Sequence, residues 1–208
     1  MGLSYPIREA HRMALGLTLV ALFAAAGCGT PGDRAASGQA GEAPTPRDLA
    51  GRPVDPLRNA TARATVLVFV QTDCPISNRY APEVKRLYDR FSSQNVAFHL
   101  IYPDPTQTTE MILTHLQLYN YPCGAIRDPQ HVLVARAGAT VTPEAAVFVG
   151  QALVYRGRID DRFIDFGIAR IEPRQRDLEN VLVRVIHGET IPLQTTQALG
   201  CYISKLAP

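Results

Sequence analysis

Cys74 is the residue of this 208-residue chain whose type and position are best suited to covalent chemistry. It lies in the segment QTDCPISNRYAPEV (71–84), between an apolar β-branched run, 64–70, and an amphipathic helical pattern that continues to Phe91. A cysteine at a strand-to-helix junction meets free backbone N–H groups and the positive end of the helix dipole, which favour the thiolate. Pro75 fits the first helical turn, where its missing N–H would have had no partner. We therefore predict that Cys74 is a reactive nucleophile.

The neighbours of Cys74 are expected to act on its charge in opposite directions. Asp73 is the adjacent carboxylate, and a nearby negative charge disfavours a thiolate. Ser77 follows one helical turn later, where it is placed to hydrogen-bond the Cys74 thiolate. Compensating positive charge can come from four arginines: Arg79, Arg156, Arg158 and Arg162. The alternative is that these arginines are solvated on the surface.

The first 27 residues have the features of an export signal. A basic region precedes an apolar run, 13–27, which is shorter than the roughly 20 residues of a membrane-spanning helix. The run ends in LFAAAGC, which resembles the lipobox of bacterial lipoproteins and implies that Cys28 is acylated; an ordinary signal peptide is the alternative. We expect a protein on the periplasmic side of a bacterial membrane, lipid-anchored through Cys28 and followed by a flexible tether over 28–46.

The rest of the chain alternates strand and helix patterns, which predicts an α/β fold with a central mixed sheet. After a small lead-in hairpin at 48–57, two parallel strands joined by a helix precede an antiparallel pair with a tight turn at Gly150. We predict one domain over 47–190 and a polar C-terminal tail over 191–208. The expected strands are 64–71, 96–102, 145–149 and 153–159, and the expected helices are 74–91, 108–120, 129–136 and 177–187.

This order, βαβ followed by ββα, resembles the thioredoxin fold, and most closely the redoxin group of the alkyl hydroperoxide reductase/thiol-specific antioxidant superfamily. Three features carry the resemblance: the cysteine that opens the first helix, Pro82 eight residues later, and Val141-Thr142-Pro143 before the third strand. The resemblance covers residues 46 to 204 and extends to exported bacterial redoxin proteins with a Gly-Cys tail. It implies that Pro143 is cis and faces Cys74, and that the backbone around Thr142 and Pro143 aligns the incoming sulfur.

Two departures from better-known relatives limit the chemistry. Ser77 stands where thioredoxins have the second cysteine of Cys-x-x-Cys, so a disulfide within one helical turn is excluded. Gln71 stands where peroxiredoxins have a threonine, which weakens the expectation of peroxidase activity. The resemblance implies a thiol oxidoreductase with protein thiols and disulfides or a peroxide as substrate, with antioxidant activity in the second case.

The cysteine count points to a distant partner for Cys74. With Cys28 acylated, Cys74, Cys123 and Cys201 remain in an oxidising compartment, and an odd number leaves one thiol unpaired. Cys201 is the preferred resolving residue, because a thiol on a flexible tail can reach an oxidised Cys74 and form a disulfide. A structural disulfide that pins the tail is the alternative. Cys123 is the rival resolver, or else a buried thiol.

Two other functions are compatible with the sequence. Exported copper chaperones share the thioredoxin fold, and Cys74 and Cys201 with His99 or His115 offer soft ligands for Cu(I). Against this, Asn78 replaces the second cysteine of the chaperone motif. A redox-inactive binding module is the other alternative. The formal net charge of +2 does not indicate nucleic-acid binding. The sequence has no phosphate-binding loop, dinucleotide-binding motif or zinc motif, so we expect cofactor-free chemistry.

Overall fold

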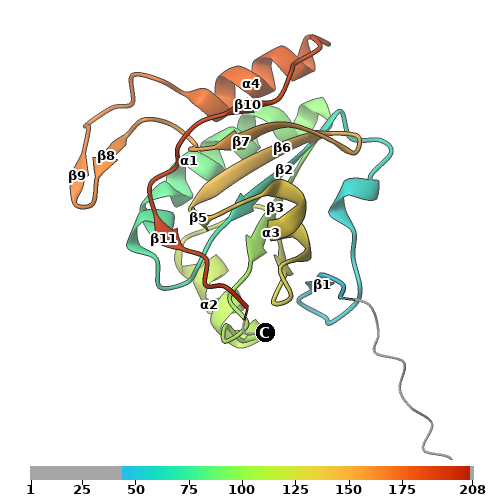
Figure 1. Ribbon diagram of the computed structural model, residues 1–208, viewed down its shortest axis with the longest axis vertical. Helices are drawn as coiled ribbons and strands as arrows, with labels where there is room; N and C mark the ends of the chain where they lie inside the picture. The colour runs from blue at the N-terminus through green and yellow to red at the C-terminus, as the bar shows by residue number, and fades with distance from the viewer. Residues whose placement is uncertain (1–43, 207–208) are drawn as a thin grey trace, which may run out of the picture. The chain divides into compact units, whose positions relative to one another are not determined.

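The computed structural model describes residues 44–206 (Figure 1). The predicted signal peptide over 1–27, the predicted acylation site Cys28 and the predicted tether up to residue 43 lie outside the described residues. Within the described part of the chain, no helix is long and apolar enough to cross a membrane.

A seven-stranded mixed sheet forms the centre of the domain. Its middle strand is β2 (Ala64–Phe69), an apolar run in which all six residues are buried, as expected for a strand covered on both faces. β2 pairs in parallel with β3 (Val96–Tyr102) and antiparallel with β6 (Glu144–Val149). From edge to edge the order is β1 (Arg47–Asp48), β4 (Gly124–Arg127), β3, β2, β6, β7 (Ala152–Gly157) and β10 (Gln194–Thr195).

The alternation of side chains along β2 divides the core between the two faces of the sheet. Val66 and Val68 belong to a larger cluster with α1 and α4, whereas Leu67 and Phe69 belong to a second cluster with α3. α1 and α4 lie side by side, joined by an ion pair between Arg86 and Glu179 (Figure 1). The helices are α1 (Pro75–Phe91), α2 (Thr109–Leu118), α3 (Val132–Ala137) and α4 (Asp177–Ile186), with 3-10 turns η1 (Pro56–Arg58) and η2 (Ser92–Gln94).

The predicted α/β fold with a central mixed sheet is confirmed. β3 has the predicted bounds, and the four predicted helices form with ends displaced by at most a few residues. α1 begins after Cys74, which takes the N-cap position, and continues through Pro82 as one helix. The lead-in hairpin forms as a short bridge between Arg47 and Pro53. β4 is absent from the prediction, because four residues are too few to show a periodic pattern.

The segment after α4 differs from the flexible tail that we predicted. β10 pairs in parallel with β7, and β11 (Cys201–Tyr202) pairs antiparallel with β5 (Val141–Thr142). Just beyond β11, the Ile203 N–H donates to the Thr140 carbonyl at 3.0 Å. Backbone hydrogen bonds with two edges of the domain therefore hold the tail in place.

A second unpredicted feature lies between β7 and α4. β8 (Phe163–Asp165) and β9 (Ile168–Ala169) form an antiparallel hairpin around a turn at Phe166 and Gly167. Gly167 has a φ of +79°, which is a conformation that favours glycine. Figure 1 shows this hairpin projecting from the side of the domain, away from the main sheet.

Candidate functional site

Cys74 lies where the chain passes from β2 into α1. It is the N-cap residue of α1, Pro75 occupies the first helical position, and the Ser77 N–H donates to the Cys74 sulfur at 3.5 Å. The sulfur therefore takes the place of the oxygen that caps many helices, at the positive end of the helix dipole. Only 1% of Cys74 is exposed. The helix thus positions the predicted nucleophile, and the fold withdraws it from solvent.

The Thr142–Pro143 peptide bond is cis, which confirms the prediction for Pro143. Thr142 ends β5 and is fully buried, and β6 begins directly after the proline. The Cys74 thiol donates a hydrogen bond to the Thr142 carbonyl oxygen at 3.0 Å. The structure therefore brings together the two segments that the family resemblance placed at the active site.

Gln71 supports the site in a way that the sequence reasoning missed. Its side-chain oxygen accepts a hydrogen bond from the Thr142 hydroxyl at 2.9 Å, and its amide group donates to the Asp104 carboxylate at 3.5 Å. These bonds connect the loops after β2 and β3 with the cis-proline segment. In the sequence, Gln71 stands out only as a polar residue directly after an apolar strand. Its position, where peroxiredoxins have a threonine, does not indicate this hydrogen-bonding role.

β11, which belongs to the C-terminal tail, lies against the site. In its pairing with β5, Cys201 lies opposite Thr142. Gly200 permits this close approach, because a β-carbon there would lie 2.0 Å from the Thr142 carbonyl oxygen. Cys201 is half-buried, and the residue opposite it, Thr142, is the one whose carbonyl accepts the hydrogen bond from the Cys74 thiol. Both cysteines are free thiols. The structure thus brings Cys201, the predicted resolving residue, to the same segment as Cys74, the predicted nucleophile.

Burial and hydrogen bonding act in opposite directions on the Cys74 thiol. Burial raises its pKa, but hydrogen bonds with the Cys201 thiol and with the hydroxyl and N–H of Ser77 outweigh burial and lower the pKa below its usual value. The Ser77 hydroxyl is buried and has no hydrogen-bond partner among the described residues, so it is available to the Cys74 thiolate. Burial and the neighbouring Cys74 raise the pKa of Cys201 to about 12, and the negative charge of Asp73 adds to this effect. Cys74 is therefore the thiol that ionises first.

None of the four candidate arginines is among the main causes of the lowered pKa of Cys74. Arg156 and Arg158 are held in ion pairs instead, with Glu144 at 3.6 Å and with Asp177 at 2.7 Å. Glu144 is buried at the start of β6, so its charge requires the arginine beside it. The arginines of this region therefore stabilise the fold around the site, and hydrogen bonds stabilise the thiolate.

Searches with the whole chain found no matching protein-family model and no matching curated protein. Solved structures do match. A hypothetical protein from Sinorhizobium meliloti has a TM-score of 0.67 at 20% identity, over 79% of this chain and 91% of that one. An uncharacterized conserved protein from Geobacillus kaustophilus has a TM-score of 0.67 at 21% identity, over 79% and 89%. The thioredoxin domain of a thiol-disulfide oxidoreductase from Bacteroides vulgatus has a TM-score of 0.50 at 13% identity, over 68% and 91%.

The chain has a thioredoxin-like fold. Among the described residues of this thioredoxin-like domain, the other candidate ligands do not form a group with Cys74 and Cys201 that could hold a metal ion. Burial raises the pKa of Cys123 to about 12, and its thiol is not among the hydrogen-bond partners of Cys74 in the described chain. His115 is buried on α2, and its ring nitrogens bond to the Tyr102 hydroxyl and the Asn78 amide oxygen, each at 2.8 Å. Over residues 44–206, no three His, Cys, Asp or Glu side chains are arranged to hold a metal ion.

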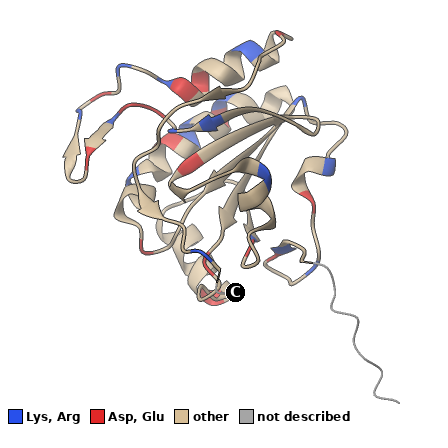
Figure 2. Cartoon of the chain, viewed as in Figure 1, with Lys and Arg blue, Asp and Glu red and all other residues tan. Residues whose placement is uncertain are grey.

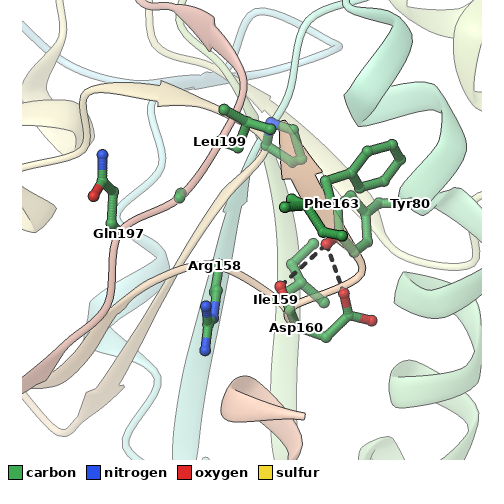
Figure 3. A pocket seen from close by; sticks show the side chains of 10 residues that line it. Tyr80, Arg158, Ile159, Asp160, Phe163, Gln197 and Leu199 are labelled. Carbon is green, nitrogen blue, oxygen red and sulfur yellow. Dashed lines mark hydrogen bonds between the residues drawn. The ribbon is translucent and has the colours of Figure 1, made fainter. Parts of the chain in front are cut away.

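A cavity of about 250 Å³ adjoins the cis-proline of the thioredoxin-like domain (Figure 3). Its walls come from α1, the loop after β7, the β8–β9 hairpin and the tail before β11. Tyr80 and Asp160 lie on one side, where the tyrosine hydroxyl donates to the buried carboxylate at 2.6 Å. Pro143 and Leu199 also line it, and each lies within two residues of a member of the thiol site. The cavity therefore lies next to the two segments that carry Thr142 and Cys201.

Proposed function

We propose that this protein is a thiol-disulfide oxidoreductase in which Cys74 is the nucleophile and Cys201 the resolving thiol. The observation that carries this proposal is the position of two free thiols on either side of Thr142: the Cys74 thiol donates to the Thr142 carbonyl, and Cys201 lies opposite Thr142 where β11 pairs with β5. Ser77 stabilises the thiolate, and the backbone around Thr142 and Pro143 aligns the incoming sulfur. The similarity in fold to a domain of a thiol-disulfide oxidoreductase is compatible with this function.

The proposed reaction consists of two sulfur displacements. The Cys74 thiolate attacks one sulfur of a substrate disulfide, the substrate S–S bond breaks, and the departing thiolate takes up a proton. Cys201 then attacks the Cys74 sulfur of the mixed disulfide and releases the second substrate thiol, to which it passes its own proton. Two electrons move from the protein to the substrate, and the protein is left with a disulfide between Cys74 and Cys201.

A peroxide starts the same cycle through a sulfenic acid. The Cys74 thiolate attacks one peroxide oxygen, the O–O bond breaks, and water or an alcohol leaves. The Cys201 thiol then condenses with the sulfenic acid, which forms the same disulfide and releases water. The burial of Cys74, which is 1% exposed, favours this small oxidant while β11 is in place.

Larger substrates require β11 to separate from β5. The two strands pair over only two residues each, so few hydrogen bonds oppose the separation. In the oxidised protein the more accessible sulfur belongs to Cys201, and the lower pKa of Cys74 makes it the better leaving group. An external thiol is therefore expected to reduce the disulfide by attack on Cys201.

We also propose that the protein is exported and anchored to a membrane through acylated Cys28. The support is the apolar segment that ends in LFAAAGC, and an extracytoplasmic location suits a protein that forms a disulfide. Growth of expressing bacteria with a palmitate analogue tests the anchor. We expect label in the wild-type protein and none in Cys28→Ser, and label in neither would disprove acylation.

Turnover of a small disulfide tests the proposed function. The protein is kept reduced by an excess dithiol, and the cleavage of a fluorescent glutathione disulfide is followed. We expect Cys74→Ser to lower the rate to the uncatalysed level. In a separate reaction without the dithiol, we expect reduced Cys201→Ser to accumulate a mixed disulfide that mass spectrometry detects. Cys123→Ser serves as the matched control and is expected to react like wild type. Equal rates for wild type and Cys74→Ser would refute the proposal.

A further inference from the structure

The β8–β9 hairpin exposes an unusual amount of apolar side chain. Ile164 is 55% exposed, Phe166 60%, Ile168 55% and Ile171 97%, and the four lie within eight residues of one another. Scattered exposed apolar residues are normal on proteins, but a contiguous group marks an interaction surface. The hairpin therefore has the side chains of a binding element rather than of a simple connection.

The base of the hairpin is fixed beside the thiol site. The ring of Phe163 packs on that of Tyr80 from α1, with 5.2 Å between the ring centroids. Figure 3 shows these two rings together with Leu199 at the cavity that adjoins Pro143, and Ile164 also lines it. The apolar surface of the hairpin thus continues into the cavity. At about 250 Å³ this cavity is smaller than the roughly 300–1,000 Å³ of sites for whole small molecules, and it suits a single large side chain.

The backbone of the hairpin is also available to a partner. In the described part of the chain, β8 and β9 pair only with one another, so the outer edge of each strand has no neighbouring strand. Unpaired strand edges bind extended peptides by adding a strand to the sheet. A polypeptide can use these backbone groups, and a lipid surface cannot.

The low net charge of the hairpin also favours a polypeptide over a lipid surface as the partner. Residues 162–174 contain three arginines and two carboxylates, a net charge of only +1 (Figure 2). Recognition of anionic lipids uses clusters of about four to eight basic residues without such compensation. Apolar contacts and backbone hydrogen bonds, rather than electrostatic attraction, are therefore the chemistry that this surface offers.

We propose that the β8–β9 hairpin docks an extended apolar segment of a polypeptide substrate. One large apolar side chain of that segment enters the cavity beside Pro143, and its backbone runs along the hairpin. This arrangement brings a cysteine of the substrate to Cys201 and Cys74, so the inference rests on the proposed function and adds the class of substrate. The hairpin itself takes no part in sulfur transfer.

Binding of an unfolded, cysteine-blocked polypeptide tests the docking surface without any redox step. Fluorescent reduced and carboxymethylated lysozyme is titrated with the full-length protein. We expect Phe166→Ser and Ile168→Ser each to weaken binding about tenfold, because a few central apolar residues carry most of the energy of such interfaces. Leu193→Ser, at a site that is 57% exposed and outside the hairpin, is the matched control and should bind like wild type.

Other outcomes would overturn the inference. Binding by the hairpin variants equal to that of wild type would exclude this surface. If the hairpin is needed for binding to phosphatidylglycerol vesicles and no polypeptide binds, the surface is a membrane-binding surface. If wild type forms a dimer that the hairpin variants disrupt, the surface binds a second copy of the chain. The glutathione disulfide assay separates the two proposals, because hairpin variants should retain its wild-type rate. Polypeptide binding without thiol turnover would refute the proposed function alone.

Discussion

Cys74 combines two properties that usually oppose one another, a buried sulfur and a lowered pKa. Burial removes water from the charged form of a thiol, which raises the pKa and makes most buried cysteines inert. Here hydrogen bonds from Ser77 and Cys201 replace part of that hydration. The reactivity of Cys74 therefore depends on these two residues rather than on a nearby cation.

Removing the Ser77 hydroxyl is expected to raise the pKa of Cys74. The lowered pKa of wild type means that the thiolate forms at lower pH than in a free cysteine, so Ser77→Ala should shift the pH profile of alkylation upward. Near neutral pH, loss of one hydrogen bond to the thiolate should slow alkylation of Cys74 several-fold, up to about tenfold. Iodoacetamide labelling across a pH series, with mass spectrometry to assign the modified cysteine, measures this effect.

Ser93→Ala provides the control for this titration, because Ser93 is exposed beyond the end of α1. Its profile should follow that of wild type. Coincident profiles for Ser77→Ala and wild type would show that the hydroxyl does not stabilise the thiolate.

Long periodic patterns account for the elements that the sequence predicted correctly. In α1, Tyr80, Val84, Leu87 and Phe91 fall at helical spacing, and all four are buried against the sheet. The strands that were missed include β4, β5 and β8 to β11, and each of these contains between two and four residues. Such short strands exist because of the strands that lie opposite them, and a local sequence pattern does not contain that information.

Displacing β11 should expose Cys74. A methyl group at Gly200 cannot fit against the Thr142 carbonyl, so Gly200→Ala should separate β11 from β5. We expect alkylation of Cys74 to become several-fold faster and the disulfide with Cys201 to form more slowly. Gly124→Ala is the matched control, because an added β-carbon there meets nothing within 4 Å. Wild-type alkylation of Cys74 in Gly200→Ala would contradict the role of β11 as a cover.

His115 joins α2 to β3 and α1, and this contact should make stability depend on pH. Burial lowers the pKa of His115 from 6.5 to about 4, so the folded protein holds it neutral where the unfolded chain protonates it. Its contribution is fully present above pH 6.5 and is lost as the pH falls toward 4. Over this window the free energy of unfolding should fall by on the order of 3 kcal/mol more in wild type than in His115→Gln.

Denaturant unfolding at a series of pH values measures the difference between these two proteins. The comparison cancels the titration of carboxylates that both proteins share. Parallel pH profiles would show that His115 does not couple protonation to folding.

At the scale of the whole molecule, the site is assembled from segments that are far apart in the sequence. Cys74 and the Thr142–Pro143 segment were predictable, because a cysteine at a helix start and a proline before a strand have local sequence signals. Cys201 was chosen from the cysteine count. The contributions of Gln71 and Gly200 were not predictable, because they depend on which backbone lies opposite Thr142 in the folded chain.

Because these distant segments meet at Thr142, the proposed mechanism depends most on a disulfide between Cys74 and Cys201. Mapping of disulfides in the oxidised full-length protein tests it most directly: the protein is treated with diamide, remaining thiols are alkylated, and unreduced peptides are analysed by mass spectrometry. We expect one bridge that joins Cys74 to Cys201, with Cys123 alkylated. A bridge between Cys74 and Cys123, or alkylation of all three cysteines after oxidation, would contradict the proposed mechanism.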